Sequence, residues 1–112
     1  MLIYTSEAEA AAMSQEEQGA LFAAYGAFTN EIREKGLMLG GDALQPASTA
    51  KTVKVRGGNL VSTDGPFAET KEQLGGYYIL DCKDWDEAVA WAAKIPAAQS
   101  GRIEVRPIME MG

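Results

Sequence analysis

Two stretches with the periodicity of an α-helix, each lying between runs typical of β-strands, constrain the fold of this chain more than any other feature. The first predicts a helix over 14–35, because Ser14 and Glu17 have the spacing of a capping box. Its apolar face consists of residues three or four positions apart: Leu21, Tyr25, Phe28 and Ile32. Gly19 and Gly26 inside this helix are explained if they let it approach a sheet closely.

The second helix is predicted to begin at Asp84, whose carboxylate would cap the free amides of the first turn, and to end before Pro96. Its apolar face consists of Trp85, Ala88, Ala92 and Ile95. Each helix therefore has one side that needs to pack against another element.

Apolar or alternating runs predict strands outside the helices, at 1–5, 37–44, 77–82 and 102–108. A bulge is expected at Gly40-Gly41. Between the second and third strands, runs 51–56 and 60–63 flank Gly57-Gly58-Asn59 and predict a β-hairpin. This order predicts an α+β fold, a ferredoxin-like split βαβ sheet with an inserted β-hairpin and both helices on one face.

Large apolar residues at neighbouring strand positions predict that the other face of the sheet is covered as well. Leu2-Ile3 and 77–80 are examples, and neighbouring side chains on a strand point to opposite faces. Because both helices are used on one face, we expect a second copy of the chain to cover the other. The prediction is a homodimer that packs sheet to sheet.

The composition is that of one globular domain over 1–112, with 46% apolar and 23% charged residues. Ten scattered bases against sixteen acids argue against binding to nucleic acid or to an anionic membrane. No apolar run approaches the roughly 20 residues that span a bilayer. The one cysteine, Cys82, cannot form an internal disulfide, so a reducing compartment, the cytoplasm, is expected.

Segment 64–76 is the densest in constrained and ionisable residues. Gly65 permits a backbone turn that other residues avoid, and Pro66 is suited to begin a short helical turn whose free amides would hold an anion or the Asp64 carboxylate. Gly75-Gly76 would let a strand or a ligand come close to the backbone.

Asp64 is the candidate catalytic residue. If its carboxylate lies beside a strand end, under Phe67 and one of the tyrosines Tyr77 and Tyr78, partial desolvation would raise its pKa and suit it to proton exchange. The alternative is a structural turn in which Asp64 bonds its own backbone. The candidate ligand-binding residues are Asp42, Gly65, Pro66, Phe67, Glu69, Lys71, Glu72 and Tyr77, although the charged ones also suit a solvated surface.

Metal and cofactor chemistry has little support in this sequence. There is no histidine and only one cysteine, so zinc, copper and haem sites are not expected. Asp42, Asp64 and Glu69 are the carboxylates that would form a Mg²⁺ or Ca²⁺ site if they met. We expect no cofactor, and Cys82, which lacks a histidine base, is expected to pack rather than react.

The stretch TDGPFAETKEQLGGYYIL resembles the signature of YCII-related proteins of the DGPF type. The resemblance extends over almost the whole chain through LIY, AYGAFTNEI, GGDALQP and IEVRPIMEM. It implies a dimeric α+β barrel, in which ferredoxin-like subunits pack through their sheets, in a family largely without assigned activity. Better-studied relatives suggest a His–Asp active site. Only Asp64 matches that pair here, so a His–Asp mechanism is excluded.

Two functions follow as hypotheses. The first is a protein that binds a small molecule, with or without weak enzymatic activity, in a pocket between the sheet and 64–76. The second, implied by the resemblance, is a regulatory module that contacts another protein, such as an extracytoplasmic-function sigma factor. A pocket that contains Asp64 would favour an enzyme, whereas an exposed apolar patch away from Asp64 would favour the module.

Overall fold

The computed structural model describes residues 1–110; Met111, the last residue of IEVRPIMEM, and Gly112 lie outside the described residues. The strands are Leu2–Thr5 (β1), Met38–Ala43 (β2), Lys51–Arg56 (β3), Asn59–Asp64 (β4), Gln73–Leu80 (β5) and Arg102–Glu104 (β6). The helices are Glu7–Ala11 (α1), Gln15–Glu34 (α2) and Trp85–Lys94 (α3), with 3-10 turns η1 at Ala47–Thr49 and η2 at Pro96–Gln99.

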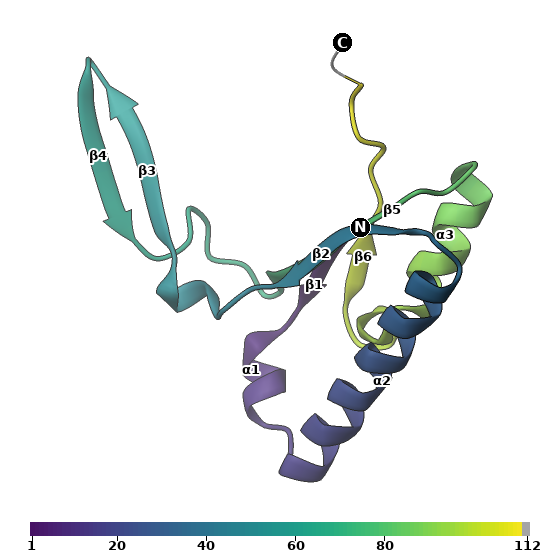
Figure 1. The fold of residues 1–112 in the computed structure, drawn as a ribbon. Helices are drawn as coiled ribbons and strands as arrows, with labels where there is room; N and C mark the ends of the chain where they lie inside the picture. The colour runs from purple at the N-terminus through teal and green to yellow at the C-terminus, as the bar shows by residue number, and fades with distance from the viewer. Residues whose placement is uncertain (111–112) are drawn as a thin grey trace.

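Four antiparallel strands form the main sheet in the order β2-β5-β1-β6. Helices α2 and α3 lie on the same side of this sheet (Figure 1). The strand order and the shared helix side confirm the ferredoxin-like α+β prediction. The sheet of the single chain is open and does not close into a barrel.

Local capping chemistry sets the helix starts as predicted. The Ser14 hydroxyl accepts from the Glu17 amide at 3.1 Å, and the Glu17 carboxylate accepts from the Ser14 amide at 3.2 Å. The Asp84 carboxylate accepts from the Glu87 amide at 2.8 Å. Each bond satisfies a helix-end amide that has no partner within the helix, which explains why these short signals are readable without tertiary information.

The core lies between the sheet and the two helices. Its buried residues are Ile3, Phe28, Ile32, Tyr78, Ile95 and Ala97. The Phe28 ring makes T-shaped contacts with the rings of Tyr78 and Trp91, with ring centres 5.2 and 6.3 Å apart. The prediction that Trp85 packs on the apolar face is wrong, since Trp85 is 56% exposed. Trp91 takes the inner position, because α3 contacts the core through its C-terminal half and η2.

Two strand boundaries and one short helix differ from the predictions. Strand β5 begins at Gln73 rather than 77, because pairing with β1 and β2 continues through its glycines. Strand β6 ends at Glu104 rather than 108, because Glu104 pairs with Leu2, where β1 starts, and no strand continues beyond it. The short helix α1, capped by the Ser6 hydroxyl at the Glu9 amide, was not predicted.

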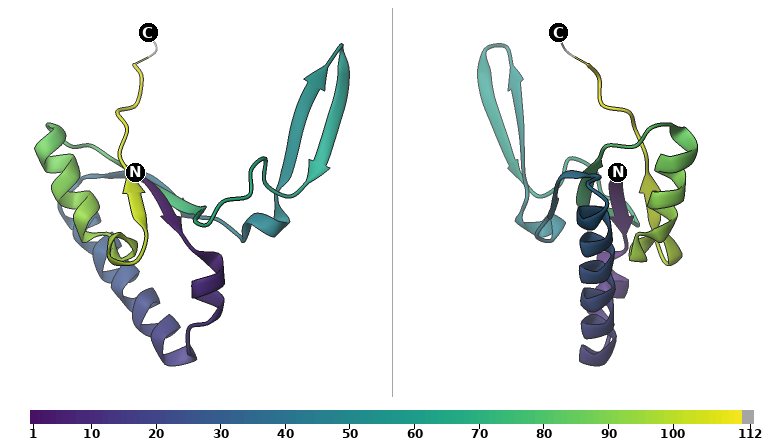
Figure 2. Two further views of the ribbon diagram at one scale, coloured as in Figure 1. Left: turned by 180° about the vertical axis from the view of Figure 1, so that it is seen from behind. Right: turned by 45° about the vertical axis from the view of Figure 1, so that its right-hand side comes forward.

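The predicted hairpin forms but belongs to a separate sheet of two strands, β3 and β4. Its turn uses Gly57 and Gly58 at φ +57° and +79°, as a two-residue hairpin turn with two left-handed positions requires. Figures 1 and 2 show the hairpin standing away from the main sheet and helices, so that it and α2 form the two limbs of a V.

In the described residues 1–110, no helix is long and apolar enough to cross a membrane.

The two α2 glycines provide a stability test. A Cβ built at Gly19 or Gly26 meets no atom within 4 Å, so the predicted close approach to the sheet is wrong. Gly26→Ala should therefore raise the free energy of unfolding by about 1 kcal/mol through helix propensity alone. Urea denaturation followed by circular dichroism measures this change.

Gly41→Ala is the matched control, because its Cβ would lie 2.9 Å from both the Tyr77 carbonyl oxygen and the Tyr78 ring. This variant should lower the free energy of unfolding. If Gly26→Ala also destabilised the protein, the α2 surface at this position would be packed against something other than solvent.

Candidate functional site

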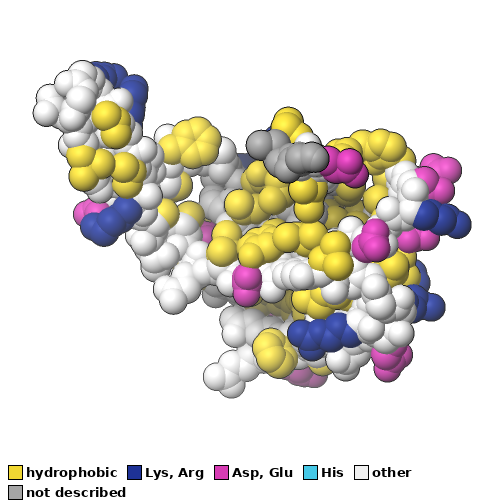
Figure 3. Space-filling model, turned by 45° about the horizontal axis from the view of Figure 1, so that its top comes forward, with side chains coloured by type: hydrophobic (Ala, Val, Ile, Leu, Met, Phe, Trp, Pro, Cys, Tyr) yellow, Lys and Arg dark blue, Asp and Glu magenta, His cyan; other side chains and the backbone are white. Residues whose placement is uncertain are grey.

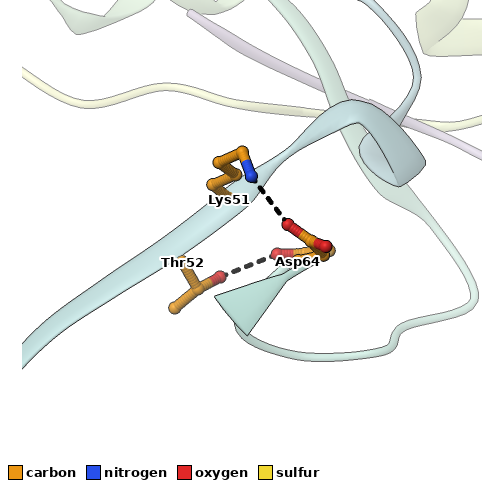
Figure 4. A network of polar contacts seen from close by, with 4 residues as sticks. Lys51, Thr52 and Asp64 are labelled. Carbon is orange, nitrogen blue, oxygen red and sulfur yellow. Dashed lines mark hydrogen bonds and ion pairs between the residues drawn. The ribbon is translucent and has the colours of Figure 1, made fainter. Parts of the chain in front are cut away.

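Asp64 lies at the base of the hairpin. Its carboxylate pairs with Lys51 at 2.9 Å, and the Thr52 hydroxyl donates to the Gly65 carbonyl oxygen at 2.8 Å (Figure 4). The Gly65 amide donates to the Ala50 carbonyl oxygen at 2.7 Å. Gly65 has φ +100°, a conformation that side chains disfavour. This part of the DGPF stretch therefore fastens the two ends of the hairpin together.

The prediction of a desolvated environment for Asp64 is wrong. Its side chain is 86% exposed, and Phe67, which was expected to cover it, is 90% exposed. Tyr78 is in the core on the helix side of the sheet, and the Tyr77 hydroxyl is bonded to Asp42. The hairpin carries Asp64 away from the sheet, so the role of Asp64 as acid, base or polar anchor stays a prediction without that support.

The residues after Gly65 form bends rather than the predicted helical turn at Pro66, so no helix end presents amides to an anion there. Side chains fix this part of the segment instead. Glu72 accepts from Arg102 at 2.9 Å. Gln73 donates to the Thr70 carbonyl oxygen at 2.6 Å and accepts from the Glu7 amide at 2.9 Å. The end of the segment is thereby tied to β6 and α1.

A groove of about 1380 Å³ runs between this segment, the connection that contains η1, and the ends of β1 and β6. Apolar side chains from all three regions line it, among them Tyr4, Leu44, Pro46, Phe67 and Leu74. The ion pair of Glu72 with Arg102 also lines it, and so does Lys71.

The groove includes only part of the predicted set of site residues. Pro66, Phe67, Lys71 and Glu72 line it. The other members of the set are not among its lining residues: Asp42, Asp64, Gly65, Glu69 and Tyr77. The structure therefore divides segment 64–76 into a hairpin base at its start and a groove wall from Pro66 onward.

Asp42 and Tyr77 form a pair of their own. They are opposite each other in the register of β2 and β5, and the Tyr77 hydroxyl donates to the Asp42 carboxylate at 2.7 Å. This hydrogen bond, and then the negative charge of Asp42, raise the pKa of the Tyr77 phenol. Residues paired across neighbouring strands share one face of a sheet. Asp42 and Tyr77 therefore lie on the face turned away from the helices, because the adjacent Tyr78 is in the core.

A second cavity, of about 710 Å³, lies between the sheet, α1 and the N-terminal half of α2. Tyr25, Thr29 and Tyr78 line it, and the Thr29 and Tyr78 hydroxyls are 2.9 Å apart. Burial, and then the neighbouring Tyr78, raise the pKa of Tyr25. This cavity was not predicted from the sequence. The sequence does contain a signal for the cavity: Tyr25 and Thr29 are four positions apart, which places two hydroxyls on the apolar face of α2.

The carboxylates considered for a metal ion do not meet. Asp42 bonds Tyr77 and Asp64 bonds Lys51, and residues 1–110 contain no group of three His, Cys, Asp or Glu side chains placed to hold a metal. Partial burial of Cys82, and then the charges of nearby carboxylates such as Glu87, raise the pKa of its thiol. A raised pKa disfavours the reactive thiolate.

Comparison with known proteins identifies the family. The model of the YCII-related domain matches residues 1–112, and the chain therefore belongs to the YCII-related domain family. An uncharacterized protein of Rhizobium meliloti (strain 1021) is 36% identical over 110 residues, which cover 96% of this chain and 89% of that protein. The family match confirms the YCII-related resemblance of the sequence.

The Asp42–Tyr77 pair leads to a prediction about pH. Replacing Asp42 by Asn removes the negative charge that opposes phenolate formation, so the pKa of Tyr77 should fall toward its ordinary value of 10.0. Titration of ¹³C-labelled tyrosines by NMR resolves the four phenols separately.

Asp86→Asn makes the same charge change on the exposed start of α3 and serves as the control. It should leave the Tyr77 titration unchanged. An equal shift in both variants would mean that overall charge, rather than the hydrogen bond, sets the pKa of Tyr77.

Proposed function

We propose that this protein acts as a homodimer that binds a small, mainly apolar molecule in the groove bordered by residues 66–74. The observation that carries the proposal is the groove itself, which combines aromatic and aliphatic walls with a few charged groups. Ligand sites commonly have this composition. We also propose that the protein is of the DGPF type within its family and works in the cytoplasm.

The character of the walls supports a ligand with an apolar body and a small polar part. Tyr4 and Phe67 offer ring faces, while Leu44 and Leu74 add aliphatic surface. The Arg102 side chain is 84% exposed although it is paired with Glu72, and a guanidinium has five donors, so donors remain that a polar group of the ligand would use.

The homodimer is supported by the uncovered face of the sheet. Strand residues alternate between faces, and Ile3 is in the core on the helix side. Leu2, opposite Tyr77, and Tyr4, opposite Leu74, therefore lie on the other side. Figure 3 shows hydrophobic side chains gathered over the body of the molecule on the face turned to the viewer.

A second copy would also complete the groove. Its volume of about 1380 Å³ exceeds the range of about 300–1,000 Å³ usual for ligand pockets, as expected of a site that is open on one side. Tyr4 and Leu74 belong both to the groove and to the uncovered face. A sheet packed on that face would narrow the opening and remove water from the ligand.

The ligand proposal is tested by a thermal-shift screen of metabolites on the wild type, repeated on two variants. Phe67→Ala removes an exposed ring from the groove wall and should abolish or greatly reduce the shift. Phe22→Ala removes a similarly exposed ring (83%) that borders the second cavity instead, and the shift should persist.

The reverse pattern would place the ligand in the second cavity and contradict the proposed groove. Asp64→Asn adds a test of the predicted role of Asp64. Because its carboxylate does not line the groove, we expect the ligand to stabilise this variant as it does the wild type. A lost response with unchanged folding would restore Asp64 as an anchor of the ligand.

A further inference from the structure

The β3–β4 hairpin exposes an apolar side to solvent. Val55 is opposite Leu60, and Val53 is opposite Ser62, so Val53, Val55 and Leu60 share one side of the hairpin. Their exposed fractions are 61%, 67% and 71%. The other side carries Lys54 and Arg56 beside Val61. The two sides are therefore chemically distinct, although neither is covered by the rest of the chain.

A free hairpin of this kind is not expected to hold its shape. An isolated pair of strands is at best marginally stable in water. The contacts at the base of this pair, among Ala50, Thr52 and Gly65, join the two ends of the hairpin to each other rather than to the body. Three large apolar side chains on one side increase the benefit of a covering surface. Since these side chains are exposed in the single chain, a covering surface would come from another molecule.

The dimensions of the chain give the scale of the missing contact. Its accessible surface is 8419 Å², whereas a compact monomer of 12.0 kDa would expose about 6,000 Å². Its radius of gyration is 16.3 Å, against about 13 Å for a compact domain of this length. The excess of roughly 2,400 Å² per chain is what a large, obligate dimer interface would remove.

The hairpin has the length needed to reach a second sheet. Figures 1 and 2 show the hairpin as one limb of the V, and Figure 3 shows hydrophobic side chains both on the hairpin and on the body beside it. Packed sheets lie about 10 Å apart, and strands of six residues extend about 20 Å. The hairpin is therefore long enough to pass beside a sheet packed on the uncovered face.

Charge favours a second copy of this chain as the occupant. Residues 51–64 contain three bases, Lys51, Lys54 and Arg56, and one acid, Asp64, for a net charge of +2. The rest of the chain has seven bases and fifteen acids, for a net charge of −8. Lys54 and Arg56 lie on the side away from Val53, Val55 and Leu60, so they act through the overall field and not through direct ion pairs: a basic hairpin on an acidic body attracts the same arrangement in a second copy turned by a two-fold axis.

We propose that the β3–β4 hairpin is a dimerisation arm: its Val53, Val55 and Leu60 side packs against a second copy of the chain whose sheet faces this one. In a two-fold dimer the arm of each copy packs against the other copy, so both arms are covered at once. The inference rests on the homodimer of the proposed function and is independent of any ligand.

The test uses two neighbouring residues on opposite sides of the hairpin. Leu60→Lys puts a charge on the apolar side and should raise the dimer dissociation constant by at least about tenfold, as loss of a buried anchor does. Val61→Lys makes the same kind of change on the basic side and should raise the dimer dissociation constant less than about threefold. Sedimentation velocity over a dilution series measures both constants.

Hydrogen–deuterium exchange on the wild type covers the case in which Leu60→Lys disrupts the hairpin itself. Amides of 53–56 and 60–63 should be protected when the protein is dimeric and exchange rapidly when it is diluted to monomer. A dimer that both variants leave intact, or hairpin amides whose exchange is independent of dilution, would overturn the arm while the homodimer stands. A wild-type chain that stays monomeric, alone or with its arm on a different protein, would overturn both.

Discussion

The packing of Phe28 and Ile32 of α2 against Ile3 and Tyr78 holds the molecule together, and it acts on one face of the sheet only. Both helices are used on that face, since α3 adds Trp91 beside the same Phe28 ring. The remaining features follow from this one-sided arrangement. No helix of the single chain covers the opposite face, and the hairpin pairs with no other strand of residues 1–110.

Segment 64–76 combines two structural tasks that its sequence does not separate. At its start, the Lys51–Asp64 pair and the bond from Thr52 to Gly65 hold the base of the hairpin. From Pro66 onward it forms one wall of the groove, fixed by the contact of Glu72 with Arg102. The same signature therefore borders both the proposed ligand site and the proposed arm, and a second copy would bring the two together.

Membership of the YCII-related family does not supply a function, because the compared relative is itself uncharacterized. The absence of histidine from this chain removes the general base most often used in enzymes. The carboxylate of Asp64 is exposed, and this position gives little support for Asp64 as the general base in place of a histidine. The proposed binding role rests on the composition of the groove walls, and in that proposal the second copy would form part of the site.

The sequence by itself determined the helices α2 and α3, the hairpin turn, the strand order and the family. Capping by Ser14 and Asp84 and the left-handed glycines of the turn act over a few residues, so they are readable locally. Only the tertiary structure decided that Asp64 is exposed and that Trp91 rather than Trp85 is inside. It also decided that the groove is bounded by elements as distant in sequence as β1 and β6. Burial and convergence depend on contacts between distant segments, which no local pattern records.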